Sequence, residues 1–158
     1  MKKIIYPGTF DPITNGHLAL IHRVMPHFEI IIAVNAASRK NVLFSTEERL
    51  QLIKESLKNY PVSILPFSGF LIDFARQQNI LTILRGLRGN TDFEYELQLA
   101  HANKRLAPEI ETIFLMANEN NTFISSSFIK EIASLQGSIE EFVPKPVAIA
   151  LKNKFNYQ

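Results

Sequence analysis

The sequence predicts an α/β fold in which helices cover one doubly wound, parallel, five-stranded sheet. Five short runs rich in Ile, Leu, Val and Phe alternate along the chain with longer stretches of helical periodicity. The runs are continuously apolar, as expected of strands that are buried on both faces of a parallel sheet. A chain of 158 residues can bury a core without disulfides, so we expect a single domain spanning residues 1–158.

The strands are predicted at residues 3–6, 30–35, 62–66, 82–85 and 112–116. Helices are predicted at residues 16–25, 70–78, 92–106, 127–135 and 146–154. One more helix is predicted to begin after Ser45, which can form a capping box with Glu48. The three- and four-residue spacings predict buried faces formed by Leu18, Ile21 and Met25 in the first helix and by Leu50, Ile53 and Leu57 in the second.

Residues 6–17, with the sequence Tyr-Pro-Gly-Thr-Phe-Asp-Pro-Ile-Thr-Asn-Gly-His, form a turn between the first strand and the first helix. Its prolines and glycines set the backbone path without much packing. Thr14 or Asn15 can cap the helix, which places His17 in the first turn, beside unpaired N–H groups and the positive end of the helix dipole. Such a position favours phosphate, and it lies where open α/β sheets bind their ligands.

Further polar segments follow other predicted strands. Arg85 and Arg88 flank Gly86 after the fourth strand, and Arg39-Lys40 follows the second. Three consecutive serines, residues 125–127, lie at the start of the helix after the fifth strand. Taken singly, each segment fits a solvated loop or a helix cap as well as a ligand site. Because all of them follow parallel strands, we interpret them together with the first turn as one anion-binding site.

The overall charge argues against general nucleic-acid binding. Lys and Arg number 17 against 15 Asp and Glu, a net charge of +2, which is too small for a broad basic surface. The apolar run after Lys3 is too short for the core of a signal peptide, and no run is long enough to span a membrane. We therefore expect a cytoplasmic protein whose partners include neither nucleic acid nor membrane.

Many common catalytic patterns are missing from the sequence. It has no cysteine, no HExxH, EF-hand, GxxxxGK[ST] or GxGxxG pattern, and no clustered His and Asp at metal-ligand spacing. The groups that remain available for chemistry are cationic side chains, helix N-termini and hydroxyl groups. These groups suit a reaction whose nucleophile is already an anion and in which negative charge grows on a phosphorus centre.

Four motifs point in combination to a family. They are the turn at residues 6–17, Arg85-Gly86-Leu87-Arg88, residues 92–96 (Asp-Phe-Glu-Tyr-Glu) and residues 123–127 (Phe-Ile-Ser-Ser-Ser). Over nearly the whole chain, this set resembles the bacterial phosphopantetheine adenylyltransferases. The wider nucleotidyltransferase superfamily usually has a histidine where Thr14 stands here, and threonine favours the phosphopantetheine branch.

The resemblance implies a Rossmann-like fold and a reaction in coenzyme A biosynthesis. An adenylyl group would pass from ATP to 4'-phosphopantetheine, giving dephospho-coenzyme A and pyrophosphate without a covalent enzyme intermediate. Magnesium would accompany ATP, with no metal ligand from the protein. The resemblance also implies a homohexamer.

The resemblance also implies roles for individual residues. The catalytic residues would be His17, Thr9, Lys40 and Arg88. The ATP-binding residues would be Thr9, Phe10, His17, Gly86, Leu87, Arg88, Glu96, Asn121, Thr122, Phe123, Ile124, Ser125, Ser126 and Ser127. The phosphopantetheine-binding residues would be Thr9, Lys40, Phe70, Leu71 and Arg85.

The chain departs from the family pattern at a few positions. Asn121 and Thr122 replace the aromatic residue and the serine often found before Phe-Ile-Ser-Ser, and Asn41 stands where proline is frequent. Phe70 and Leu71 occupy positions that vary between relatives. These departures concern substrate affinity, above all at one wall of the adenine pocket, and not the type of reaction.

Two other functions fit the same residues. One is a related nucleotidyltransferase with another phosphorylated acceptor, and the other is a regulatory module that binds ATP without transferring any part of it. Pyrophosphate release with different acceptors distinguishes these functions. The gathering of several cations at one edge of the sheet favours catalysis over binding alone.

Overall fold

The computed structural model describes residues 1–37, 41–118 and 122–157, and its strands form one five-stranded parallel sheet. The strands are β1 (Lys2–Gly8), β2 (Phe28–Asn35), β3 (Ser63–Phe67), β4 (Thr82–Leu87) and β5 (Glu111–Met116). Their order across the sheet is β3-β2-β1-β4-β5. The predicted doubly wound fold is confirmed, and every predicted strand overlaps an observed one.

The helices are α1 (Asn15–Val24), α2 (Thr46–Ser56), α3 (Leu71–Gln77), α4 (Asn90–Leu106), α5 (Ser126–Ser134) and α6 (Lys145–Lys154). Complete capping boxes stabilise the N-termini of α1 and α2, where Thr14 pairs with His17 and Ser45 pairs with Glu48. The Ser45 box is confirmed, and of the two candidate caps for α1 the chain uses Thr14.

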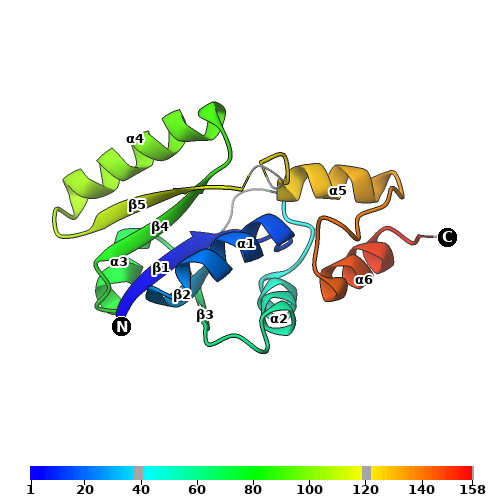
Figure 1. Ribbon diagram of the computed structural model, residues 1–158, viewed down its shortest axis with the longest axis horizontal. Helices are drawn as coiled ribbons and strands as arrows, with labels where there is room; N and C mark the ends of the chain where they lie inside the picture. The colour runs from blue at the N-terminus through cyan, green and yellow to red at the C-terminus, as the bar shows by residue number, and fades with distance from the viewer. Residues whose placement is uncertain (38–40, 119–121, 158) are drawn as a thin grey trace.

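Apolar clusters cover both faces of the sheet. Ile4 and Tyr6 of β1 belong to the larger cluster, together with apolar side chains of α1, α2, α5 and α6. Ile5, between them in sequence, belongs to the smaller cluster with α3, because successive side chains of a strand point to opposite faces. Figure 1 shows α5 and α6 together towards the C-terminus, at the opposite end of the molecule from α3 and α4.

The predicted buried faces of α1 and α2 are partly wrong. The buried residues of α1 are Leu20, Ile21 and Val24, whereas Leu18 and Met25 are only partly buried. In α2, Leu50 is likewise only partly buried, whereas the predicted Ile53 and Leu57 are buried, together with Arg49 and Leu52. Spacings of three and four residues fit overlapping stripes on one helix. The spacing alone therefore cannot tell which edge of the stripe faces the sheet.

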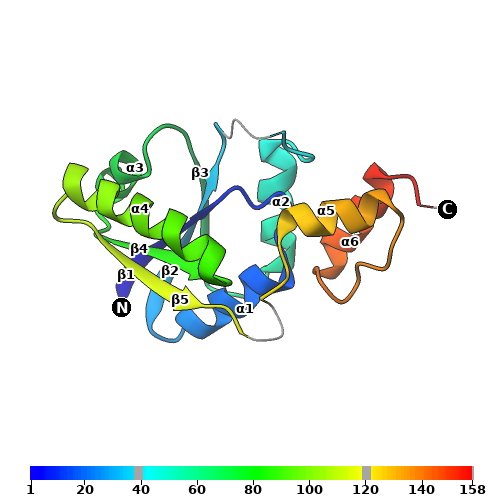
Figure 2. The same ribbon diagram turned by 90° about the horizontal axis from the view of Figure 1, so that it is seen from above.

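The strand order reverses beside β1. From β1 the chain winds outward through β2 to β3, and β4 returns to the other side of β1 before β5. β1 and β4 are neighbouring parallel strands, so the segments that follow them begin at the same end of the sheet (Figures 1 and 2). A parallel sheet has its ligand crevice at such a switch point.

No helix in the described part of the chain combines the length and the apolar composition that a membrane crossing requires.

Candidate active site

His17 lies in the first turn of α1, and Thr14 fixes its ring. The backbone N–H of Thr14 donates to Nδ1 at 3.0 Å, and Thr14 Oγ1 lies 3.0 Å from the same atom. Because Nδ1 accepts a backbone hydrogen bond, we assign the proton of the neutral ring to Nε2. Burial, with a smaller effect of the positive charge of Arg88, lowers the pKa of His17 to about 4. At pH 7 the ring is therefore a neutral donor through Nε2.

The low pKa of His17 predicts a pH dependence of stability. We expect the free energy of unfolding to fall as the pH drops from 6.5 towards about 4. In that window the unfolded chain, with an ordinary histidine, binds a proton that the folded state excludes. Urea denaturation at a series of pH values measures the slope. A His17→Asn variant should lose this component, whereas His22→Asn, an exposed histidine of the same helix, should keep it; equal slopes in wild type and His17→Asn would contradict the assignment.

Phe10 supports the His17 ring from inside the core. Its side chain is only 3% exposed, and its ring meets those of Tyr6 and His17 edge-on, with centroids 5.4 and 5.0 Å away. A Cβ on Gly8 would lie 2.9 Å from the Phe10 ring, so packing requires glycine there. Burial raises the pKa of Tyr6 far above its usual value, although Arg85 and Arg88 act in the opposite direction. The contacting rings of Tyr6, Phe10 and His17 are therefore uncharged at neutral pH.

Arg85 is held in place by Glu96 of α4. Its Nε and Nη2 donate to the two carboxylate oxygens at 2.6 and 2.5 Å, and its Nη1 donates to the carbonyl of Pro7 at 3.1 Å. The side chains of Arg85 and Glu96 are 25% and 11% exposed. Burial works against the charged guanidinium, but the hydrogen bonds and charge of Glu96 outweigh it, so the pKa of Arg85 is raised. Arg85 is thus a fixed cation at the end of β4.

Arg88 is the more accessible cation of the β4–α4 turn. Its Nε and Nη2 donate to the Asp92 carboxylate at 2.9 and 3.3 Å, and its Nη1 reaches the carbonyl of Ile124 at 3.5 Å. Leu87, between the two arginines, is buried. A Cβ on Gly86 would lie 2.7 Å from Leu20 Cδ1, so this glycine allows α1 to approach β4 closely.

The serine segment before α5 is anchored to the first turn. Ser125 caps α5 by accepting from the N–H of Phe128, and Ser126 Oγ donates to the carbonyl of Pro12 at 2.8 Å. Ile124 is buried, and the exposed Phe123 meets Phe142 edge-on. Ser127 and Thr122 are also exposed. The segment therefore presents hydroxyl groups beside the first turn.

Direct hydrogen bonds join the first turn, the β4–α4 turn and the serine segment. Arg85 contacts Pro7, Arg88 contacts Ile124, and Ser126 contacts Pro12. His17 and Arg88 are also close enough for the charge of Arg88 to lower the pKa of the imidazole. Most of the predicted site residues thus meet at one edge of the sheet. Lys40 and Asn121 lie outside the described residues.

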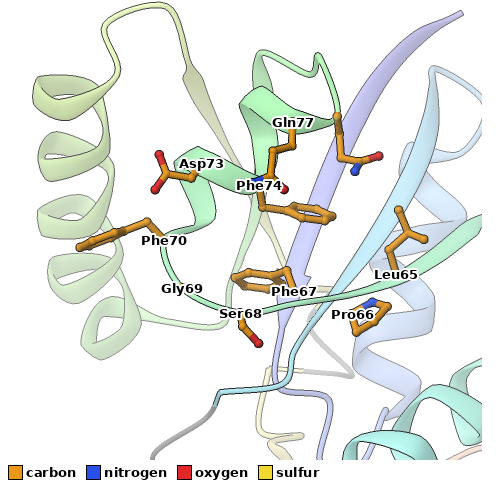
Figure 3. A pocket seen from close by; sticks show the side chains of 10 residues that line it. Leu65, Pro66, Phe67, Ser68, Gly69, Phe70, Asp73, Phe74 and Gln77 are labelled. Carbon is orange, nitrogen blue, oxygen red and sulfur yellow. The ribbon is translucent and has the colours of Figure 1, made fainter.

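The two residues predicted to line the pantetheine arm lie farther out, beside β3. A hollow of about 530 Å³ lies between β3 and α3, and Phe70 is at its rim. Figure 3 shows the Phe70 ring turned away from the hollow, and its side chain is 69% exposed. Leu71 packs instead against the smaller core cluster. None of the residues that line this hollow belongs to the first turn or the β4–α4 turn.

Asp11, Arg49 and Lys130 hold the first turn in place, and none of the three was predicted from the sequence as a functional residue. Arg49 is 1% exposed, and its Nη1 donates to the carbonyls of Thr9 and Asn35 at 2.8 and 2.9 Å. Asp11 pairs with Lys130 at 2.8 Å. Arg49 precedes Leu52 and Ile53 by three and four residues, which places a charged residue on the buried stripe of α2. This position is the sequence feature that could have identified Arg49.

Within the described residues, no group of three or more His, Asp or Glu side chains could hold a metal ion.

Comparison with known proteins places the chain in a family. Residues 5–132 match the cytidylyltransferase-like family. A phosphopantetheine adenylyltransferase of Desulfitobacterium hafniense is 51% identical and covers 99% of this chain and 97% of its own length. Those of Lawsonia intracellularis and Methylacidiphilum infernorum are 50% and 48% identical, each covering 98% of this chain and 91% of their own length.

A solved structure supports the fold alone. The Plasmodium falciparum nicotinic acid mononucleotide adenylyltransferase, in complex with NaAD, aligns with a TM-score of 0.71 over 100% of this chain and 99% of its own, at 16% identity. The agreement extends the fold beyond close relatives, while the family assignment rests on the sequence matches. The chain belongs to the cytidylyltransferase-like family and, within it, to the phosphopantetheine adenylyltransferases.

Proposed function

We propose that this protein transfers the adenylyl group of ATP to 4'-phosphopantetheine, giving dephospho-coenzyme A and pyrophosphate. The main support is its identity of about half with phosphopantetheine adenylyltransferases along nearly the full chain. The site is consistent with this reaction, because His17, Arg85 and Arg88 are donors at the carboxyl edge of β1 and β4. Two anionic substrates need such donors, since their mutual repulsion opposes binding at one place.

In this reaction a phosphate oxygen of phosphopantetheine attacks the α-phosphorus of ATP in line. The new bond joins that oxygen to the α-phosphorus, while the bond from the α-phosphorus to the oxygen bridging to the β-phosphate breaks. Pyrophosphate leaves with the electron pair. The nucleophile is already an anion, so no general base is required. The protein's part is to position the two phosphates and to stabilise the charge that grows on the transferred group.

Each donor has a role that fits its state in the structure. His17, a neutral donor through Nε2, would hydrogen-bond an oxygen of the α-phosphate as its charge grows. Arg88, the more exposed arginine, would bind the ATP phosphates, and the partly buried Arg85 would bind the phosphate of phosphopantetheine. We propose that magnesium arrives on ATP and offsets part of its charge, as part of the substrate.

Asp92 should limit ATP affinity, because its carboxylate already pairs with the Arg88 guanidinium and competes with the ATP phosphates for it. We expect Asp92→Asn to lower the Kd of ATP by about two- to fivefold at low ionic strength, the range expected of a partly exposed ion pair. Calorimetric titration with magnesium-ATP measures the change, and added salt should reduce it. Glu109→Gln is a matched control, since Glu109 pairs with Arg76 at 2.7 Å on an exposed surface. A weaker ATP affinity in Asp92→Asn would contradict the assignment of Arg88.

The test of the function is incubation with ATP, magnesium and phosphopantetheine, followed by mass analysis. Dephospho-coenzyme A and an equal amount of pyrophosphate are expected, and both should vanish when magnesium is left out. Nicotinamide mononucleotide in place of phosphopantetheine tests a related acceptor, and CTP in place of ATP tests another nucleotide. Tight ATP binding without pyrophosphate from any acceptor would instead indicate a regulatory module.

We also propose that the protein is a homo-oligomer, a hexamer as the family resemblance implies. The support is a group of exposed apolar side chains on α4 and the edge strand β5, namely Phe93, Tyr95, Leu99, Leu106, Ile113 and Met116. Light scattering coupled to gel filtration measures the mass.

The proposed substrates are charged metabolites of the cell interior, so we place the reaction in the cytoplasm.

A further inference from the structure

Asp11 is a buried carboxylate in the first turn, and its hydrogen bonds reach the segment before α2 and helix α5. Its side chain is 3% exposed. Its two oxygens accept from the backbone N–H groups of Leu43 and Phe44, at 2.8 and 2.9 Å. Asp11 thereby fastens the turn after β1 to the segment that leads into α2, more than 30 residues later in the sequence. Backbone donors on a carboxylate of this kind form strong, oriented hydrogen bonds.

Lys130 is the cation that pairs directly with Asp11, and the nearby charge of Arg49 also acts on this carboxylate. Lys130 Nζ lies 2.8 Å from Asp11 Oδ2, the oxygen that also accepts from Leu43, and the lysine side chain is only 24% exposed. Lys130 lies in α5, one turn after the serine segment. The pair therefore connects the first turn to a third element. A carboxylate this deeply buried is strongly disfavoured without a partner of opposite charge.

Contacts on either side of Asp11 immobilise the backbone of the turn. Arg49 of α2 donates to the carbonyl of Thr9, and Ser126 of α5 donates to the carbonyl of Pro12. Asp11 lies between these two carbonyls and is bonded to both sides, to the α2 entry through its backbone donors and to α5 through Lys130. Thr9, a predicted substrate-binding residue, is thus two residues from the point at which α2 and α5 are joined.

We propose that Asp11 and Lys130 are positioning residues for adenylyl transfer, which set the distance between the first turn, the entry of α2 and the serine segment. The inference rests on the proposed function. It does not require either side chain to touch a substrate. Without the Lys130 charge, the Asp11 hydrogen bonds to the 43–44 backbone weaken, and Thr9 and His17 no longer face the reacting phosphates in the same geometry, although Arg49 still donates to the carbonyls of Thr9 and Phe44. A misplacement of about 1 Å can lower a rate by up to about 100-fold.

The test compares Lys130→Met, which keeps the aliphatic stem, with Lys130→Arg, which keeps the charge. For Lys130→Met we expect kcat to fall by about 10- to 100-fold, while KM for each substrate changes by less than about threefold. Lys130→Arg should stay within about threefold of wild type. Hydrogen exchange at the amides of Leu43 and Phe44 should speed up by about tenfold or more in Lys130→Met, with the amides of β2 unchanged. Lys104→Met is the matched control, because Lys104 pairs with Glu111 at 2.5 Å on an exposed surface.

A chemical rescue keeps the proposal testable if Lys130→Met does not fold. The chain has no cysteine, so Lys130→Cys introduces a single thiol. Alkylation with 2-bromoethylamine restores an ammonium group at nearly the length of lysine, whereas iodoacetamide leaves a neutral amide. Recovery of kcat and of amide protection in the charged form alone supports the proposal. Equal activity of the charged and neutral forms, or loss of the whole fold in every neutral form, overturns it.

The proposed adenylyl transfer and the positioning role of Lys130 can be tested separately. If wild-type protein forms no dephospho-coenzyme A, the proposed function fails, but the exchange of the Leu43 and Phe44 amides still reports whether Lys130 fixes the turn. If wild type is active and Lys130→Met keeps both its kcat and its amide protection, the positioning role fails and the function stands.

Discussion

Replacing His17 by alanine should leave the protein folded and lower kcat by about 10² to 10³-fold, equivalent to about 3 to 4 kcal/mol of transition-state stabilisation. The physical reason is the state of the ring. Thr14 holds Nδ1 as an acceptor and the pKa is lowered to about 4, so Nε2–H is a preorganised neutral donor. Such a donor gains strength as negative charge grows on the α-phosphate, and therefore acts mainly on kcat rather than on KM.

The measurement is steady-state pyrophosphate release with both substrates varied. His22→Ala is the control, since His22 lies on the same helix but is exposed and packs against Tyr60. If His17 acted as a charged acid with an ordinary pKa, activity would fall as the pH rises through 6.5. With a pKa of about 4, the rate should instead be insensitive to His17 titration above pH 6. An undiminished kcat in His17→Ala would remove the ring from the mechanism.

The sequence predicted the fold well because its signals are local. Continuous apolar runs, the Ser45 capping box and the turn at residues 6–17 each depend on neighbours in the chain, and all of them appear in the structure. The shared edge of the sheet followed from parallel topology. The helix stripe of α1 was misjudged because Leu18 and Leu20 lie on edges of one apolar face, and only tertiary packing selects between them.

The partners of the charged groups could not be predicted in the same way. Arg85 has several carboxylates within a dozen residues, and only the path of α4 brings Glu96 rather than Glu94 to its guanidinium. Asp11 meets Leu43, Phe44 and Lys130 across separations that no local pattern encodes. The residues expected to bind anions were predicted from the sequence, and their binding role stays a prediction, whereas the residues that hold the first turn in place became visible only with coordinates.

Arg85 should have a structural and a functional role that a double-mutant cycle can separate. Arg85→Met removes a bidentate partner from a carboxylate that is almost buried, and we expect it to lower the free energy of unfolding by roughly 3 kcal/mol. Adding Glu96→Leu removes the stranded carboxylate as well, so the double variant should regain most of that stability. It should not regain activity, because the cation proposed to bind the phosphopantetheine phosphate is still missing. Urea denaturation and phosphopantetheine titration, applied to the same four proteins, measure the two effects.

A further variant, outside the cycle, decides what Glu96 does. Glu96→Gln keeps the shape of the side chain but removes the charge that holds Arg85 through two hydrogen bonds. If Glu96 mainly orients Arg85, this variant should weaken phosphopantetheine binding more than ATP binding. If instead Glu96 contacts ATP directly, as the family resemblance implies, ATP affinity should fall first. Equal stability of Arg85→Met and wild type would show that water reaches the carboxylate easily, and the pair would then have to be regarded as part of the solvated surface.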